Sequence, residues 1–274
     1  MSSIQDLFDV RDARVVVTGA ASGLGLAMAE VMADAGALVT LADLEPKRLE
    51  EETARLADAG GKVRSFQLDV SDRKQVQALI DDVVAEHGGI DVLYANAGIS
   101  LEPGITDPKG GIAAIETETW ERVLGVNLSG VVFSMGAAAE VMKRQGSGKI
   151  IVTASNAGLK VEPLVGYSYA ATKAAVIHVV RQAAVELAPH GVNVNAIAPG
   201  PFRTRIGSGD LPDQRIERIW ADLIPVGRMA ETDELKGLVL MLGSPAASFI
   251  TGAVVLIDGG AMPSPFREET SLGG

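Results

Sequence analysis

Short runs of β-branched and aliphatic residues alternate with longer, helix-like stretches along most of this chain. The short runs predict strands over residues 14–18, 38–42, 63–68, 92–95, 149–153, 192–196 and 253–257. The longer stretches predict helices over residues 25–35, 47–59, 73–87, 120–144, 169–188 and 233–242. Several strand runs are almost continuously apolar, which is typical of strands covered on both faces. The alternation therefore predicts a parallel sheet with right-handed crossovers and helices on both sides.

The same pattern indicates a single domain. The chain has 274 residues and is 47% hydrophobic, which is enough to bury one large core. No low-complexity linker or internal repeat interrupts it, and the Pro- and Gly-dense stretches 102–111 and 199–212 are typical of loops. We expect an α/β fold, a Rossmann-like, doubly wound parallel sheet of about seven strands. About residues 14–260 form its core, and the tail after Ala261 is expected to be loosely packed or to contact another subunit.

Charge and composition narrow the function classes. The formal net charge is −11 and the sequence pI is near 4.8, which argues against nucleic acid or an anionic membrane surface as partner. The chain has no cysteine, which excludes disulfides, thiolate catalysis and cysteine metal sites. The N-terminus has no basic and apolar segments of a secretion signal, and no stretch approaches ~18 continuous apolar residues. We therefore expect a soluble, cytoplasmic protein that acts on small molecules.

Tyr169 and Lys173 lie four residues apart in a predicted helix, so their side chains share one face. A tyrosine that transfers protons near neutrality needs a pKa roughly 3 units below its ordinary ~10, or about 4 kcal/mol. One positive charge at ~4 Å in an effective dielectric of ~20 supplies about that much. The pair predicts an acid–base tyrosine whose pKa the lysine lowers. These residue types also meet at this spacing by chance on many helices.

A glycine-rich turn follows the first predicted strand. Gly19, Gly23 and Gly25 lie where the strand passes into a helix, so the backbone can approach a pyrophosphate at the helix N-terminus. Asp43 ends the second strand, about where an acidic residue binds the ribose hydroxyls of a dinucleotide. Taken alone, the glycines fit an ordinary turn and the acid a solvated turn residue. Together they indicate a dinucleotide site.

Polar or glycine residues also follow the next two strands. Asp69 and Val70 come after the third strand, and Asn96, Ala97 and Gly98 come after the fourth. Each group can be plain turn chemistry, because Asp, Asn and Gly favour turns. Ligands of open α/β sheets bind at the carboxyl ends of the strands, and four consecutive ends of this kind favour a ligand site there.

On these motifs the chain resembles the short-chain dehydrogenase/reductase family over about residues 14–260. The resemblance implies that the glycine turn binds phosphates, Asp43 the adenosine ribose, and Asp69-Val70 the adenine. The segment after the sixth strand is similar to the family's Pro-Gly…Thr segment, which contacts the nicotinamide. The implied cofactor-binding residues are Gly19, Ser22, Gly23, Leu24, Gly25, Asp43, Asp69, Val70, Asn96, Ala97, Gly98, Tyr169, Lys173, Pro199, Gly200, Phe202 and Thr204. Ala95 departs from the family's Asn-Asn-Ala-Gly motif by replacing its first asparagine.

The resemblance also implies a catalytic set of Asn127, Ser155, Tyr169 and Lys173. Tyr169 would exchange the hydroxyl proton, and Lys173 would lower its pKa and hold the nicotinamide ribose. Ser155 would orient the substrate oxygen, and Asn127 would hold a water that leads to the lysine. Asn127 can also be a buried asparagine that satisfies backbone groups.

The serine assignment has a rival. Ser155 lies one residue further from Tyr169 than the commonest family spacing, and that spacing would select Asn156. The Ala-Gly-Leu that follows in the sequence favours Ser155, because the intervening loop absorbs an extra residue easily. Tyr167 has alanine rather than lysine four residues later, so we expect it to line the substrate pocket.

No metal or hydrolase site is expected. The histidines lie on different predicted helices without a second ligand at metal spacing, and no Gly-x-Ser-x-Gly motif is present. The expected substrate pocket consists of Leu101, Leu159, Glu162, Tyr167, Phe202, Ile206 and Trp220. Arg203 and Arg205 are the nearby cations that could pair with an acidic substrate. The stretch 102–111 is expected beside the cleft, where it either shapes substrate choice or is a plain surface insertion.

The resemblance implies an oxidoreductase that uses NAD to interconvert a secondary alcohol and a ketone. One alternative is a 3-oxoacyl thioester reductase of the same family, but those usually prefer NADPH and carry basic residues where this chain has Ser22, Asp43 and Leu44. A non-catalytic NAD sensor is another alternative, against which the complete catalytic set argues. Relatives of this length are usually homotetramers, and the predicted helices 120–144 and 169–188 are apolar over more than one face, as burial against a partner requires.

Overall fold

The structure contains the expected parallel sheet. The computed structural model describes residues 3–204, 206, 212 and 214–262, and its seven strands follow the order β3-β2-β1-β4-β5-β6-β7 with parallel pairing throughout. The strands are β1 (Arg14–Thr18), β2 (Leu38–Asp43), β3 (Lys62–Gln67), β4 (Val92–Ala95), β5 (Gly148–Thr153), β6 (Val192–Pro199) and β7 (Val254–Ile257). Strand β6 is longer than expected, because it continues past residue 196 to Pro199.

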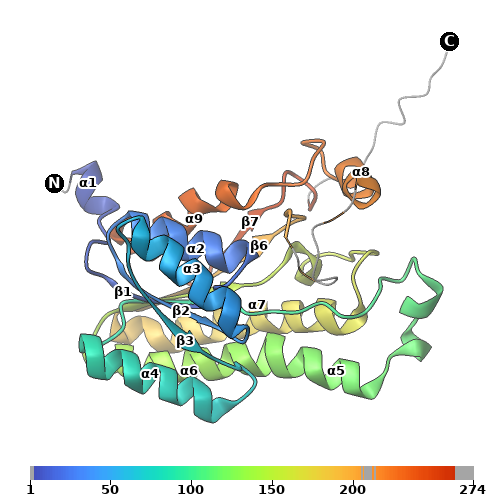
Figure 1. The fold of residues 1–274 in the computed structure, drawn as a ribbon. Coiled ribbons are helices and arrows are strands. Elements are labelled where there is room, and N and C mark those ends of the chain that lie inside the picture. Colours follow the sequence, from blue (N-terminus) through green and yellow to red (C-terminus); the bar gives the residue numbers. More distant parts are fainter. Residues whose placement is uncertain (1–2, 205, 207–211, 213, 263–274) are drawn as a thin grey trace.

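Helices cover both faces of the sheet (Figure 1). One layer consists of α2 (Gly23–Asp34), α3 (Pro46–Asp58) and α9 (Lys236–Gly243). The opposite layer consists of α4 (Arg73–His87), α5 (Thr117–Leu124), α6 (Val131–Gln145) and α7 (Tyr167–Leu187). The remaining helices of the described residues are α1 (Ile4–Leu7), α8 (Gln214–Leu223), η1 (Pro108–Gly110), η2 (Ile112–Ala114), η4 (Asn156–Gly158), η5 (Ala188–His190), η6 (Thr232–Leu235) and η7 (Pro245–Ala247). The doubly wound α/β architecture predicted from the sequence is therefore confirmed.

Each layer has its own hydrophobic core. Successive side chains of a strand point to opposite faces, so Val16 and Leu93 pack toward α4, α6 and α7, whereas Val17 and Tyr94 pack toward α2, α3 and α9. All four residues are fully buried, and burying one such side chain contributes roughly 1.5–3 kcal/mol. The nearly continuous apolar runs of the sequence are explained by this double coverage.

The helix expected over residues 120–144 runs from Thr117 to Gln145 and changes its hydrogen-bonding pattern in the middle. A π-helical turn, η3 (Gly125–Gly130), joins α5 to α6. By length and composition alone this helix could cross a membrane. Half of its most apolar window is buried, and it packs against the sheet and against α4 and α7.

Helix α8 was not expected from the sequence. Its apolar residues Ile216, Ile219, Trp220 and Leu223 follow helical spacing, which is the signal that predicts it. The stretch 102–111 is a loop, as expected, although it contains the helical turn η1. The tail after residue 262 lies outside the described residues.

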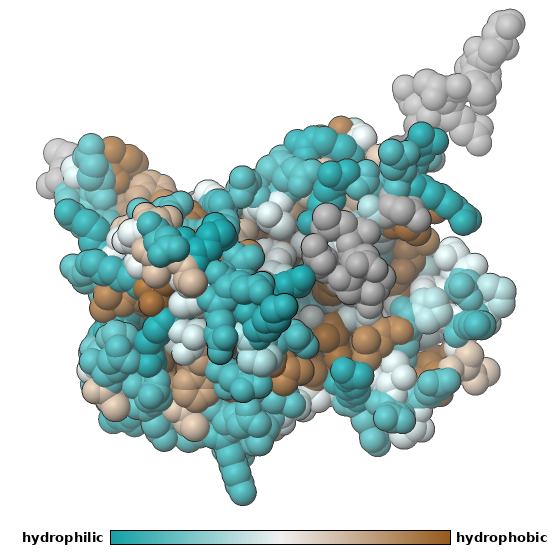
Figure 2. Space-filling model, viewed as in Figure 1, coloured by the Kyte–Doolittle hydropathy of each residue, from teal (hydrophilic) through white to brown (hydrophobic). Residues whose placement is uncertain are grey.

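The carboxyl ends of the strands meet at one edge of the sheet. From β1 the chain continues to β2 on one side, and from β4 to β5 on the other, so the strand order reverses between β1 and β4. Such a switch point leaves a crevice outside the strand ends. Figure 2 shows a mostly hydrophilic surface in this view, with apolar residues gathered near its centre.

Candidate active site

Ser155 and Tyr169 are brought together at the carboxyl edge of the sheet. Ser155 follows β5, is 7% exposed, and accepts a 3.1 Å hydrogen bond from the Ala157 amide as the cap of η4. Its hydroxyl lies near enough to the phenol of Tyr169, in the first turn of α7, to lower the pKa of that phenol. The buried Asn156 instead has a side-chain nitrogen with no partner among the described residues. The geometry therefore favours Ser155 over Asn156 as the residue that faces the phenol.

Lys173 lies one helical turn after Tyr169 and is 2% exposed. Its Nζ is 5.5 Å from the centroid of the Tyr169 ring and donates a 2.7 Å hydrogen bond to the carbonyl of Thr153. Burial lowers the pKa of its ammonium group to about 8. A backbone carbonyl thus holds the amine beside the tyrosine.

The expected lowering of the Tyr169 pKa by Lys173 is wrong for this geometry. Burial raises the pKa of the phenol, and the Ser155 hydroxyl opposes that rise. The Nζ of Lys173 is directed to the Thr153 carbonyl, and burial lowers the pKa of its own ammonium group. A shared helix face therefore brings the two side chains together without lowering the tyrosine pKa.

Asn127 lies in the π-helical turn and is fully buried. Its Oδ1 accepts a 2.8 Å hydrogen bond from the Ile99 amide, and its Nδ2 donates a 2.8 Å hydrogen bond to the Ile99 carbonyl. A Cβ on Gly98 would lie 3.5 Å from both Asn127 Oδ1 and Lys173 Nζ. Asn127 therefore satisfies backbone groups, and it shares Gly98 as a neighbour with Lys173.

The glycine turn after β1 has the geometry that its sequence predicts. Gly19 and Gly23 have φ values of 66° and 56°, in the left-handed region that favours glycine. A Cβ on Gly25 would collide with the Gly19 carbonyl, so α2 can pack this closely against the turn only with glycine there. Ser22 is the N-cap of α2 but makes no side-chain capping hydrogen bond. Leu24 packs against the hydrophobic core between the sheet and the layer of α2, α3 and α9.

Asp43 ends β2 and lies beside this turn. One carboxylate oxygen accepts a 2.9 Å hydrogen bond from the Ala21 amide, and the other accepts a 3.1 Å bond from the Glu45 amide. A carboxylate oxygen accepts more than one hydrogen bond, so both remain able to bind hydroxyl donors. Asp43 consequently supports the turn as well as presenting an acidic group at its edge.

Asn96 connects three strand ends. Its Nδ2 donates to the carbonyls of Thr18 and Gly19 at 3.1 and 3.2 Å, and its Oδ1 accepts a 2.9 Å bond from the Thr153 hydroxyl. The Thr18 hydroxyl in turn accepts bonds from the amides of Asn96 and Ala97. The Asn96 side chain thus braces the turn. The sequence analysis did not assign Thr18 and Thr153, although each is the polar last residue of a strand.

Asp69 and Val70 follow β3. Asp69 accepts hydrogen bonds from the amide and the hydroxyl of Ser71 at 2.9 and 2.6 Å. Val70 is 7% exposed and lies so close to Gly130 that no Cβ would fit there. Both residues lie at the sheet edge, where the resemblance places the adenine.

The segment after β6 reaches the glycine turn. The Gly200 amide bonds the Ile257 carbonyl, and a Cβ on Gly23 would lie 3.4 Å from the Thr204 side chain. Phe202 is 6% exposed and belongs to the core between the sheet and α2. Its ring is therefore not free to bind substrate or cofactor, and only its backbone remains available.

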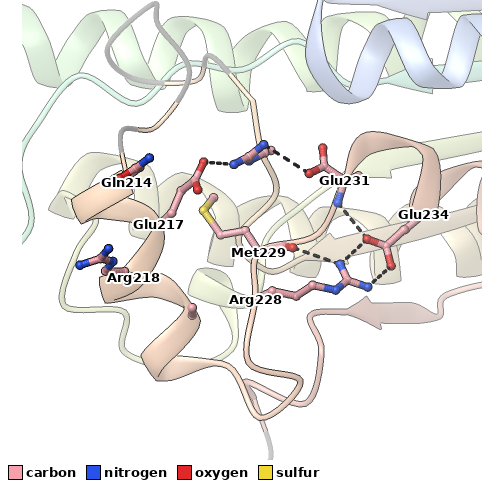
Figure 3. Close-up of a pocket in the computed structure, with 9 residues that line it drawn as sticks. Gln214, Glu217, Arg218, Arg228, Met229, Glu231 and Glu234 are labelled. Carbon is pink, nitrogen blue, oxygen red and sulfur yellow. Dashed lines mark hydrogen bonds and ion pairs between the residues drawn. The ribbon is translucent and has the colours of Figure 1, made fainter.

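Arg203 is not free to pair with an acidic substrate, contrary to expectation. It forms ion pairs with Glu217 at 2.5 Å and with Glu231 at 3.7 Å, across a cavity of about 700 Å³ between α8 and η6 (Figure 3). Arg228 and Glu234 form a second, bidentate pair in the same cavity. Sequence alone does not show these partners, because Glu217 and Glu231 come from other elements. Arg205 lies outside the described residues.

The other expected pocket residues are not all in one place. Leu101 and Tyr167 line a cavity beside the 102–111 stretch, and Leu159 packs on the core of the α7 layer. Glu162 is 8% exposed and pairs with Lys160 at 3.5 Å. Ile206 is half-exposed, and Trp220 is partly buried in α8. Among the described residues, no group of three or more His, Asp or Glu side chains is placed to hold a metal ion.

Comparison with known proteins agrees with the geometry. The family described as enoyl-(acyl carrier protein) reductase matches residues 19–262. The cis-4-hydroxycyclohexanecarboxylate dehydrogenase of Sinomonas cyclohexanicum is 38% identical over 89% of this chain and 94% of its own length. The galactitol 2-dehydrogenase of Agrobacterium fabrum is 38% identical over 89% of this chain and 95% of its own length.

A solved structure shows the same fold. The short-chain type dehydrogenase/reductase from Mycobacterium marinum superposes with a TM-score of 0.88 at 37% identity, covering 96% of this chain and 100% of that one. The family match also spans the residues from the glycine turn to the Ser155–Tyr169–Lys173 arrangement and beyond. The chain therefore belongs to the short-chain dehydrogenase/reductase family.

Proposed function

We propose that this protein is an NAD-dependent oxidoreductase that interconverts a secondary alcohol and a ketone. The observation that carries the proposal is the cluster of Ser155, Tyr169 and Lys173, with Lys173 Nζ 5.5 Å from the tyrosine ring, at the edge where the glycine turn also lies. The names of two relatives, a hydroxycyclohexanecarboxylate dehydrogenase and a galactitol dehydrogenase, support an alcohol as substrate.

The residues present fit a dinucleotide. The N-terminus of α2 has no acidic residue in its first turn and no side-chain cap, so its amides are available to phosphate. Gly19, Gly23 and Gly25 allow close approach of a ligand to the backbone, and Asp43 offers acceptors for ribose hydroxyls. Bound NAD would supply the hydride acceptor and, through its positively charged ring, favour the ionised phenol.

The chain's own groups perform the proton chemistry. Tyr169 takes the proton of the substrate hydroxyl in oxidation and returns it in reduction. The Ser155 hydroxyl holds the substrate oxygen next to the phenol and stabilises the charge that develops on it. Lys173, with a pKa near 8, can exchange a proton near neutrality and hold ribose hydroxyls. Asn127 holds the backbone of Ile99 in place through two hydrogen bonds.

Asp43 supports NAD rather than NADP. The additional phosphate of NADP would face the carboxylate, and the next residues, Leu44 and Glu45, bring no positive charge. This feature also disfavours an NADPH-dependent 3-oxoacyl thioester reductase. We further propose that the protein is cytoplasmic. We also propose that it forms a homotetramer, because apolar side chains are exposed on α6, α7 and near β7.

A substrate screen tests the proposed activity. Purified protein with NAD is assayed for NADH formation against polyols, cyclic and aryl secondary alcohols and hydroxy acids, and with NADPH against a 3-oxoacyl thioester. Turnover of at least one secondary alcohol with NAD is expected. Turnover of only the thioester would select the reductase, and NADH binding without turnover of any compound would select a sensor.

A further inference from the structure

Thr153, the last residue of β5, makes two hydrogen bonds that lead to different parts of the site. Its backbone carbonyl accepts the 2.7 Å hydrogen bond from Lys173 Nζ. Its hydroxyl donates a 2.9 Å hydrogen bond to Asn96 Oδ1. Among the described residues the lysine amine has no other hydrogen-bond acceptor, so the position of the amine depends on where Thr153 lies.

Asn96 continues this connection into the glycine turn. Its Nδ2 donates a 3.2 Å hydrogen bond to the Gly19 carbonyl, and a Cβ on Gly25 would lie only 2.5 Å from the same nitrogen. The amide group is therefore packed against the two glycines that shape the turn. Three consecutive hydrogen bonds, by way of Thr153 and Asn96, thus join the Lys173 amine to the glycine turn.

Strand pairing does not hold Thr153 on the side of β4. The register between β4 and β5 ends with the pair Ala95 and Val152, one residue earlier. On the side of β6 the ladder continues, because Thr153 is paired with Ile197. The hydroxyl bond to Asn96 therefore takes the place of strand pairing in fixing Thr153 toward β4.

The connection is shielded from solvent. Thr153 is 8% exposed and Lys173 is 2% exposed, so water competes little for these hydrogen bonds. In such surroundings a hydrogen bond is strong, and an acceptor that loses its donor is costly. The spacing between the amine and the turn is consequently set before any ligand binds.

We propose that Thr153 is a positioning residue that sets the distance between the Lys173 amine and the glycine turn for a dinucleotide that contacts both. This inference rests on the proposed function, in which the turn binds the pyrophosphate and Lys173 holds the nicotinamide ribose. Thr153 acts through Lys173 and Asn96 and need not touch the cofactor. A ligand with two attachment points binds most tightly when the protein holds both points at the matching distance in advance. A ligand that reaches only the turn gains nothing from this spacing.

The variant Thr153→Val tests the proposal, because it removes the hydroxyl and keeps the backbone carbonyl. Two ligands separate the effects: NADH reaches both attachment points, whereas ADP lacks the nicotinamide ribose. In calorimetric titrations we expect the Kd of NADH to rise roughly 10-fold and the Kd of ADP to change less than about 3-fold. Thr153→Ala also lacks the hydroxyl and should give the same result. Thr153→Ser restores a hydroxyl and should return the ratio of the two constants to within about 3-fold of wild type.

The matched control is Thr40→Val, the same change at a fully buried position of β2, where the hydroxyl accepts a 3.0 Å hydrogen bond from Arg64. It should lower the stability in thermal unfolding without changing the ratio of the Kd values for NADH and ADP. Lys173→Met should weaken NADH relative to ADP. Adding Thr153→Val to Lys173→Met should change that ratio no further, because the effect of the hydroxyl passes through the lysine.

The outcomes separate this proposal from the proposed function. An unchanged ratio of the two constants in Thr153→Val would overturn the role of Thr153, and the proposed activity would stand if the protein still oxidises an alcohol with NAD. A selective loss of NADH binding in Thr153→Val, in a protein that oxidises no alcohol, would support the role of Thr153 and reject the activity. A wild type that binds NADH no more tightly than ADP would overturn the dinucleotide site and this proposal with it.

Discussion

At the residue scale, the proposed chemistry depends on the phenol of Tyr169. Tyr169→Phe removes the acid–base hydroxyl and keeps the ring beside Lys173. We expect turnover to fall by about 10²- to 10⁴-fold, the usual contribution of general acid–base catalysis, while NADH binding remains within a few-fold of wild type. Steady-state kinetics and a fluorescence titration with NADH measure the two effects. Substantial residual turnover would mean that another group transfers the proton.

The buried amine of Lys173 links stability to pH. Its pKa in the folded protein is about 8, below the value near 10.5 of an exposed lysine. Between these values the unfolded chain binds more protons, so the free energy of unfolding rises with pH, by at most about 3 kcal/mol. Lys173→Met lacks this contribution. The stability of wild type relative to Lys173→Met should increase from about pH 8 to pH 10 in urea denaturation; a constant or decreasing difference would contradict it.

We expect Asp43 to set a preference for NAD over NADP. Repulsion between its carboxylate and the phosphate of NADP is at most about 4 kcal/mol at ~4 Å, and solvent reduces it to about half. We expect a preference for NAD of roughly 30-fold or more in kcat/KM. Because Asp43 also holds the Ala21 amide, Asp43→Ala should weaken NAD without improving NADP.

The isosteric control Asp43→Asn keeps an acceptor for that amide and should retain more activity with NAD than Asp43→Ala. Equal kcat/KM for NAD and NADP in the wild type would falsify the assignment and restore the NADPH-dependent reductase as the leading alternative.

The sequence located Asp43 because it ends a strand, and Tyr169 and Lys173 because of their spacing on a helix, but it could not supply their partners. Arg203 is separated from Glu217 and Glu231 by loops, and nothing local in the sequence predicts that it is already paired. The Tyr169 pKa likewise depends on burial, which one helix face does not reveal. Partners and burial are tertiary properties, and these two corrected expectations concern them.

At the scale of the element, the π-helical turn that carries Asn127 controls the position of Ile99. Asn127→Ala would leave the partly buried amide and carbonyl of Ile99 without their 2.8 Å partners. At about 1–3 kcal/mol for each unsatisfied group, we expect a loss of roughly 2–5 kcal/mol in stability. Thermal and urea unfolding measure it, with the exposed Glu121→Ala on the same helix as control. A loss below about 1 kcal/mol would show that water replaces the side chain.

Elements were predictable where burial imposes a pattern on the sequence. Strands between two helical layers must be apolar at every position, so their ends were located closely. The π-helical turn was not predictable, because its residues satisfy α-helical periodicity equally well. Helix α8 lies outside the strand–helix alternation, and its amphipathic spacing was overlooked for that reason.

At the scale of the whole molecule, exposed apolar residues favour assembly. Val132 on α6 is 41% exposed, Val185 on α7 is 79% exposed, and Phe249 before β7 is fully exposed. We expect light scattering to give four times the chain mass of 28.4 kDa at micromolar concentration. Phe249→Glu should shift the mass to smaller species, whereas Ile4→Glu, at another exposed apolar position, should not. A monomer mass for the wild type would reject the tetramer.

We expect the brace formed by Asn96 to limit when, during synthesis, this protein can first hold a nucleotide. Asn96 bonds to Thr18, 78 positions earlier, and to Thr153, 57 positions later. A ribosome-bound chain that ends before β5 carries the glycine turn and Asp43 but lacks the strand that completes their support. Because such non-local pairings form late, an N-terminal half is expected to emerge as an exposed parallel sheet edge that needs chaperone protection. The cofactor motifs near the N-terminus therefore do not make an independent nucleotide-binding module.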